Sequence, residues 1–492
     1  MAIIKRDEIY TVTITGMNHD GQGVGRIEGM AVFVDGALSG EICEIKILTS
    51  KKSYATAELI KIIKKSENRI ETFCKHFVNC GGCSLQHMNY DAQLLMKADI
   101  VKDSLQRIGK IENVKVNQTI GMDSPFYYRN KAQFPIGIEA GKPVCGFYSR
   151  RSHDICNILS CGIQDAVSIA VNEAVKEFIS KYKVRVYEEK KRTGLLRHVI
   201  TRVGFKTGEV MVVIVINGDD LPYKDELVVM IKEKVDGIGL TKVDGISVVN
   251  DGAMQSGDKQ KAGDGKFEQL RSEKAVLKSV FLNINTRNTN IILGEKSKKI
   301  FGEDKITDFI GKYKFEISPL SFFQVNPVQT EVMYNKVLDY AGLTGNETVF
   351  DIYCGAGTIS LFLSEKAKKV YGIEVVPEAV HDALKNAEIN GIKNVEFIEG
   401  DAETVIPALK AKGIIPDVVV VDPPRKGCDE SILETIAQMG PKRIIYVSCN
   451  PSTLARDLRY LEDNGYKTKE AQPIDMFPWT PHVECVVRIE RK

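Results

Sequence analysis

The sequence predicts an α/β protein in three parts: a small β-barrel, a mixed α+β central region and a C-terminal, doubly wound parallel sheet. The sheet is predicted because five apolar segments alternate with helical segments after Phe315, as in parallel sheets covered on both faces. These segments span residues 347–353, 369–374, 395–399, 417–421 and 443–448. The barrel is predicted because the apolar segments before residue 64 are short, closely spaced and separated by glycine turns.

The predicted barrel covers residues 1–64. The glycine-rich stretch 20–26 is expected to be a loop. Its strands are expected at 8–15, 31–34, 41–48 and 55–63. OB-like barrels commonly read nucleic acid, and nearby lysines favour RNA as the partner. These lysines are Lys51, Lys52, Lys61, Lys64 and Lys65.

Residues 65–316 are expected to form the central domain. Apolar residues at helical spacing predict helices at 167–182 and 221–235, and an apolar run predicts a strand at 209–216. Residues 251–273 are rich in Gly, Lys and Asp and lack apolar periodicity, so a flexible insertion is expected there.

The composition limits the class of protein. The net charge of the 492 residues is only +2, so any basic surface must be local. The chain has no apolar run of membrane-spanning length and no signal-peptide core, so a cytoplasmic protein without a membrane partner is expected. No obligate protein partner is evident. Because cytoplasmic thiols stay reduced, clusters among the 11 cysteines indicate metal binding or catalysis.

The strand ends of the C-terminal part carry a candidate cofactor site. The first strand runs into the turn 353–358 (Y-C-G-A-G-T), whose glycines allow a ligand to approach the backbone. The next strand ends at Glu374, which can bind both hydroxyls of a ribose. Asp401 and Asp422 follow the third and fourth strands. Acidic residues at consecutive strand ends resemble the fold of methyltransferases that depend on S-adenosylmethionine.

Cys449 is a candidate nucleophile. It follows the apolar run 443–447 and precedes an Asn-Pro turn, which places it at the carboxyl end of a strand. A thiolate is strongly nucleophilic near neutral pH, although a cysteine can also be a small buried apolar residue.

The Asp422-Pro-Pro sequence leaves a second enzyme class open. It resembles the motif of amino-group methylases, which place an aromatic ring after the prolines, whereas Arg425 stands there in this chain. An RNA cytosine-5 methylase would have its cysteine directly after the prolines. Here the candidate cysteine, Cys449, comes one strand later.

Taken together, six segments closely resemble the RNA (uracil-5-)-methyltransferase family. They span residues 318–326, 351–355, 422–427, 447–451, 453–457 and 475–484. The resemblance implies that residues 317–492 form a Rossmann-like methyltransferase domain and that the barrel is a TRAM domain. It also implies an RNA methyltransferase that makes 5-methyluridine with S-adenosylmethionine.

Uracil chemistry explains the residues that the resemblance brings together. Carbon 5 of uracil takes a methyl group only after a thiolate has added to carbon 6, and a base must then remove the carbon 5 proton. The resemblance implies that Cys449 is the nucleophile and Glu484, expected at the end of a strand, is the base. It places Gln324, Tyr353, Thr358, Glu374 and Asp401 around the cofactor. Asp422 would border both cofactor and base and accept a hydrogen bond from the uracil ring.

Four cysteines form a candidate metal site. Cys74, Cys80, Cys83 and Cys161 suit either zinc or an iron–sulfur cluster, and spacing does not decide between them. The pattern resembles family members with a 4Fe–4S cluster on these four residues, with Cys156 as a competitor for the fourth position. Methyl transfer consumes no electrons, so a structural or RNA-positioning role is expected.

The RNA substrate is expected to be unstacked before reaction. Residues 127–131 and 197–198 supply aromatic and basic groups for single-stranded RNA. The cysteines favour 23S rRNA by family association, and tRNA is the alternative. A catalytically silent RNA-binding homologue is a further alternative, although it would have no need of Cys449, Asp422 and Glu484.

Overall fold

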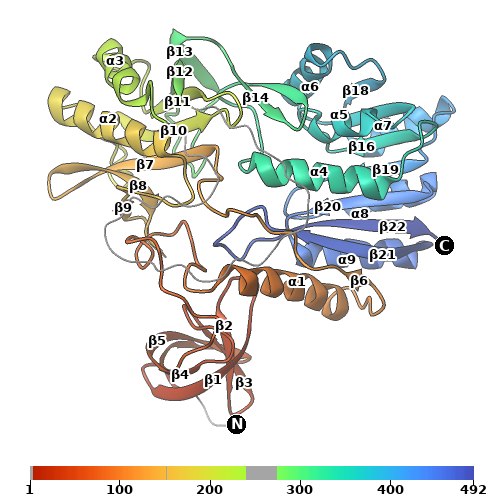
Figure 1. The fold of residues 1–492 in the computed structure, drawn as a ribbon, viewed down its shortest axis with the longest axis horizontal. Helices are drawn as coiled ribbons and strands as arrows, with labels where there is room; N and C mark the ends of the chain where they lie inside the picture. The colour runs from red at the N-terminus through yellow and green to blue at the C-terminus, as the bar shows by residue number, and fades with distance from the viewer. Residues whose placement is uncertain (1–3, 151, 240–273) are drawn as a thin grey trace.

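The computed structural model describes residues 4–150, 152–239 and 274–492, which form a barrel, a central sheet and a C-terminal sheet (Figure 1). The insertion predicted at 251–273 lies outside the described residues. Among the described residues, no helix combines the length and apolar character needed to cross a membrane.

The barrel closes from five strands in the order β1-β2-β3-β5-β4. These are β1 (Ile9–Met17), β2 (Gly23–Ile27), β3 (Met30–Val34), β4 (Ile42–Ser50) and β5 (Tyr54–Lys64). The prediction of a loop at 20–26 is wrong for residues 23–26, which belong to β2. A Cβ at Gly25 would lie 2.5 Å from Val12 Cγ2, so this glycine permits close approach of strands rather than a turn.

The central sheet has the strand order β13-β12-β11-β10-β7-β8-β9. Its strands are β7 (Lys131–Glu139), β8 (Lys142–Tyr148), β9 (Ile155–Asn157), β10 (Leu196–Val203), β11 (Glu209–Ile216), β12 (Val276–Ile284) and β13 (Lys296–Gly302). Helices α2 (Ala166–Tyr182) and α3 (Lys224–Val235) cover one face. The strand predicted at 209–216 and both predicted helices are confirmed. The second helix starts later than expected because Leu221 precedes a proline, which disfavours helical backbone.

The C-terminal sheet has the order β18-β17-β16-β19-β20-β22-β21-β6. Five strands are parallel: β16 (Thr348–Ile352), β17 (Lys369–Glu374), β18 (Val395–Glu399), β19 (Val418–Val421) and β20 (Arg443–Ser448). All five predicted strands are thus confirmed. The sheet is nevertheless mixed, because β22 (Glu484–Arg491) runs antiparallel to β20 and β21 (Tyr466–Ile474) antiparallel to β22.

Helices cover both faces of this sheet, as the doubly wound prediction requires. Helices α4 (Pro327–Ala341), α5 (Thr358–Ser364) and α6 (Pro377–Ile389) pack on one face. Helices α7 (Ala402–Ala411), α8 (Glu430–Met439) and α9 (Pro451–Asp463) pack on the other. Successive residues of one strand serve opposite faces: Val349 packs in the first layer and Phe350 in the second.

Two connections join the central region to the C-terminal sheet. The hairpin of β14 (Ile306–Ile310) and β15 (Tyr313–Ile317) shares one apolar core with the open face of the central sheet and with α4. Helix α1 (Tyr90–Arg107) packs on α9, and β6 (Lys115–Val116) pairs with β21 (Figure 1). Residues 90–116, placed by sequence in the central region, therefore complete the C-terminal sheet.

Candidate active site

A cavity of about 1460 Å³ lies where the carboxyl ends of the parallel strands face the central sheet. It is lined by seven of the predicted site residues: Gln324, Tyr353, Thr358, Glu374, Asp422, Cys449 and Glu484. Asp401 does not line it. Asp401 lies with an exposed side chain at the N-terminus of α7, so its cofactor role stays a prediction.

One side of the cavity, where the cofactor is predicted to bind, is organised around Glu374 at the end of β17. One carboxylate oxygen accepts a hydrogen bond from the Gly355 N–H at 3.0 Å, and the other accepts from the Val376 N–H at 2.9 Å. These bonds hold the carboxylate beside the glycine turn and leave lone pairs for ligand hydroxyls. A Cβ at Gly357 would lie 2.6 Å from the Phe397 ring, so this turn requires glycine.

The central sheet supports the opposite wall. Asn130 donates a hydrogen bond to the Gln324 carbonyl at 3.0 Å, and Arg202 donates to the Ser321 carbonyl at 2.7 Å. Phe281 and Ser297, from β12 and β13, line the cavity directly. Sequence reasoning missed these two residues because neither lies in a motif of the C-terminal part.

Replacing Glu374 with glutamine is expected to weaken S-adenosylmethionine binding by about 10- to 100-fold, because charge-assisted hydrogen bonds are lost. The exposed Glu388 on α6 provides a matched control, Glu388→Gln. Titration calorimetry of both variants measures the effect. Equal affinity in the two variants would remove Glu374 from the cofactor site.

The side of the cavity that holds Cys449 is assembled by strand register. Cys449 directly follows β20, and Ser448, its neighbour, pairs with Cys485 of β22. Glu484, the first residue of β22, therefore lies beside Cys449. The expectation that Glu484 ends a strand is wrong, because prolines at 478 and 481 prevent pairing before it. Asp422 follows Val421, which pairs with Ile352 of β16.

The ionisable groups in this part of the cavity are strongly perturbed. Burial raises the pKa of Asp422 to about 7. Burial, and then the neighbouring Asp422, raises the pKa of Glu484 to about 8, while Arg425 opposes the shift. Burial followed by the two carboxylates raises the pKa of Cys449 to about 11, again against Arg425. A cation bound in the cavity would lower all three pKa values, and such perturbed clusters are typical of catalytic sites.

The four predicted metal ligands come from two loops. Cys74, Cys80 and Cys83 precede α1, and Cys161 follows β9. Burial, and to a smaller extent nearby thiols that include Cys161, raise the pKa of Cys80 and Cys83 to about 12. In the described ranges, no three His, Cys, Asp or Glu side chains are arranged to hold a metal ion. The thiols suit an iron–sulfur cluster by donor type alone, and the cluster remains a prediction.

The predicted RNA contacts are partly wrong. Tyr128, Arg197 and His198 are buried. Tyr128 donates a hydrogen bond to the Pro478 carbonyl at 3.1 Å, and Arg197 donates to the Asn285 carbonyl at 2.6 Å. These side chains support the fold, so they cannot form an RNA-binding surface.

Comparison with known proteins identifies the chain. Residues 266–492 match the tRNA (Uracil-5-)-methyltransferase family model, and residues 5–60 match the TRAM domain. The chain is 51% identical to an uncharacterized RNA methyltransferase of Caldanaerobacter subterraneus subsp. tengcongensis over 99% of both chains. It is 47% identical to one of Clostridium tetani, covering 98% of this chain and 96% of the relative.

A solved structure covers nearly the same length. The Pyrococcus abyssi tRNA (uracil-54, C5)-methyltransferase in complex with S-adenosyl-L-homocysteine has 27% identity and a TM-score of 0.71, covering 98% of this chain and 100% of that one. The fold, the cavity and these matches define an RNA methyltransferase that depends on S-adenosylmethionine. More particularly, the chain belongs to the RNA uracil-5-methyltransferase family and has an N-terminal TRAM domain.

Proposed function

We propose that this protein methylates carbon 5 of a uridine in RNA through a covalent adduct between Cys449 and carbon 6. One observation carries the proposal: the thiol of Cys449 and the carboxyl of Glu484 lie at adjacent ends of paired strands, in the same cavity as Glu374. Bound S-adenosylmethionine would supply an electrophilic methyl group.

The residues then divide the chemistry. The Cys449 thiolate adds to carbon 6, and the displaced ring electrons let carbon 5 attack the methyl carbon, whose bond electrons return to sulfur. The Glu484 carboxylate removes the carbon 5 proton, and the carbon–sulfur bond breaks to release the thiolate. Asp422, which lines the same cavity, would accept a hydrogen bond from the N3–H of uracil, a donor that cytosine lacks.

Two RNA classes are candidates for the substrate. The resemblance of the cysteine pattern to family members with a cluster favours 23S rRNA. The family model and the Pyrococcus abyssi enzyme, which methylates uracil 54 of tRNA by its description, support tRNA as the second candidate.

Product analysis tests the proposal. The protein is incubated with methyl-labelled S-adenosylmethionine and with transcripts of 23S rRNA or tRNA, and the digested nucleosides are separated by mass spectrometry. We expect label in 5-methyluridine from one transcript only, which identifies the RNA class. Label in a base-methylated adenosine or cytidine would support the amino-group alternative, and binding without label would support the silent homologue.

The cysteine site yields a separate prediction. Protein purified without oxygen is expected to contain iron and acid-labile sulfide in equal amounts, held by Cys74, Cys80, Cys83 and Cys161. Cys161→Ser should lower the iron content, whereas Cys156→Ser should not. The reverse result would transfer the fourth position to Cys156, and zinc in place of iron would overturn the assignment of the metal.

A further inference from the structure

The loop of residues 475–483, here called the hairpin loop, joins β21 to β22 and leads directly into Glu484. Ile474 at the end of β21 pairs with Glu484 at the start of β22. Asp475 is therefore the first residue beyond the last paired position and is the chain neighbour of the residue that pairs with Glu484. A contact that fixes Asp475 therefore also fixes the start of β22, where the proposed base Glu484 lies.

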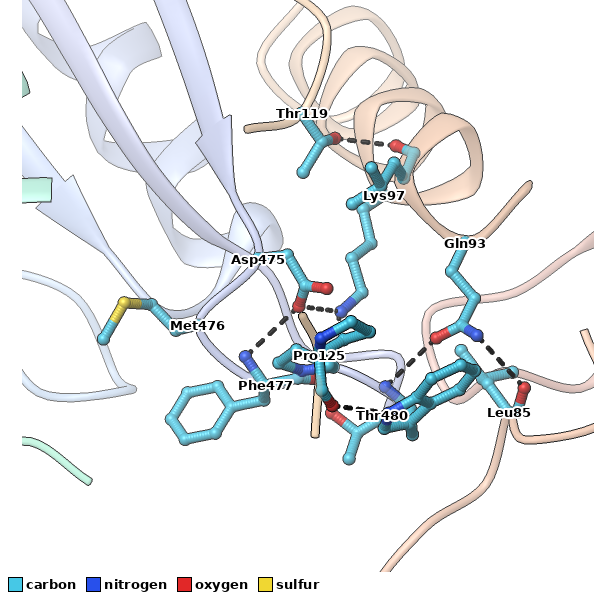
Figure 2. Close-up of polar contacts among 12 residues, drawn as sticks. Leu85, Gln93, Lys97, Thr119, Pro125, Asp475, Met476, Phe477 and Thr480 are labelled. Atoms are coloured by element: carbon cyan, nitrogen blue, oxygen red, sulfur yellow. Dashed lines mark hydrogen bonds and ion pairs between the residues drawn. The ribbon is translucent and has the colours of Figure 1, made fainter. Parts of the chain in front are cut away.

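Asp475 is held by a lysine from a distant element. Lys97 of α1 approaches Asp475 with Nζ 2.5 Å from Oδ1, and both side chains are fully buried. The same ammonium donates a second hydrogen bond to the Phe477 carbonyl at 3.2 Å. Figure 2 shows Lys97 reaching from its helix to the turn that carries Asp475 and Phe477. One cation therefore fixes two points of the hairpin loop.

The Asp475 carboxylate accepts further hydrogen bonds besides the one from Lys97. Its Oδ2 accepts a hydrogen bond from the Tyr90 hydroxyl at 2.9 Å, and its Oδ1 accepts from the Phe477 N–H at 3.2 Å. The Tyr90 oxygen in turn accepts from the Met122 N–H at 2.9 Å. With each partner oriented by another, the loop has little freedom to shift at this end.

The middle of the hairpin loop is anchored by the same helix. The Trp479 N–H donates to Gln93 Oε1 at 3.1 Å, and its indole N–H donates to the Pro125 carbonyl at 2.7 Å. Trp479 has a φ of 68°, a left-handed conformation that a bulky residue keeps only when its surroundings impose it. Trp479 is also the single tryptophan of the chain and is 4% exposed.

A buried ion pair is a poor device for stability alone, because apolar residues of similar size often stabilise as well or better. A buried charge with defined hydrogen-bond partners instead restricts the loop to one conformation. We infer that Lys97 is a positioning residue for Glu484, which it holds through Asp475 and Phe477. This inference rests on the proposed function.

The inference separates one step from the others. Glu374 ends β17 and Cys449 follows β20. Lys97 donates its hydrogen bonds to the hairpin loop and to neither of these strands, so cofactor binding and thiolate addition should survive its loss. Removal of the carbon 5 proton should slow, because displacing the Glu484 carboxylate by about 1 Å costs about 100-fold in rate. A methylated protein–RNA adduct should therefore accumulate.

The test compares Lys97→Met with Lys102→Met, which removes an exposed lysine from the same helix. Each variant is mixed with S-adenosylmethionine and unmodified uridine RNA, and the adduct is followed on denaturing gels over time. We expect Lys97→Met to release RNA about 100-fold more slowly than wild type and Lys102→Met to match wild type. Tryptophan emission of Lys97→Met should shift to longer wavelength, reporting a displaced Trp479.

Asp475→Asn provides a second variant, because asparagine keeps the shape of the side chain. Burial already lowers the pKa of Lys97, so Lys97 can lose its proton when the carboxylate is removed. Asp475→Asn should show the same slow release even if Lys97→Met folds poorly. If the variants also lose cofactor affinity and adduct formation to the same extent as RNA release, Lys97 has only a general structural role. Wild-type protein that forms no adduct with 5-fluorouridine RNA would instead overturn the proposed function itself.

Discussion

Cys449→Ala is expected to abolish methyl transfer, lowering kcat by at least about 10⁴-fold, because carbon 5 of uracil is not nucleophilic until a thiolate has added to carbon 6. The variant should still bind S-adenosylmethionine, since Glu374 and the glycine turn are unchanged. The loss would therefore lie in the chemical step rather than in assembly of the site.

RNA that contains 5-fluorouridine tests this prediction by trapping the covalent adduct with Cys449. Fluorine on carbon 5 cannot be removed as a proton can, so wild-type protein should form a stable adduct that migrates slowly on a denaturing gel. Cys449→Ala should give no such band, whereas Cys43→Ala, which removes a thiol from the barrel, should give the wild-type band. Methylated product from Cys449→Ala would exclude the covalent mechanism.

Glu484→Gln is expected to stop the reaction after methyl transfer. Without a base the carbon 5 proton stays in place, so one methyl group should be transferred per protein and turnover should fall by at least about 10³-fold. The product would be a methylated RNA bound covalently to Cys449. Mass spectrometry of the trapped peptide measures it, and free methylated RNA in excess of the protein would contradict the role of Glu484.

The raised pKa of Glu484 adds a pH signature. A base is active only when deprotonated, so release in the wild type should accelerate as pH rises towards about 8 and then level off. A carboxyl whose pKa is above the ordinary 4.5 in the folded state favours folding at low pH and loses that contribution as pH rises. At pH 9, Glu484→Gln should therefore melt at a higher temperature than the wild type. A lower melting temperature would show that the ionised carboxylate is stabilised by partners.

Sequence predicts those site residues that lie where a strand ends. Glu374, Asp422 and Cys449 each close an apolar run, and parallel strands bring their carboxyl ends to one edge, so local pattern implies proximity. Glu484 differs because its place depends on insertion of β22 between β20 and β21. That pairing depends on long-range register, which alternation along one segment does not specify.

Lys97 shows why the support of the site could not be predicted. A lysine in an amphipathic helix is normally solvated, and its partner, Asp475, lies far away in the sequence. Phe281 and Ser297 were missed for a similar reason, since the central sheet reaches the cavity only when both sheets have packed. In contrast, Arg197 and His198 were assigned to RNA on residue type alone, which takes no account of burial.

The packing of α1 against α9 has a consequence for biosynthesis. Val101 and Leu105 leave the ribosome long before Leu454 and Leu458, which belong to the helix that packs on them. Until then the nascent chain exposes an apolar helix face and an open sheet edge, because β6 has no β21 to pair with. Such contacts close slowly and leave the chain prone to aggregation. Truncation near the C-terminus should therefore impair the yield of the whole polypeptide, including parts translated long before the missing segment.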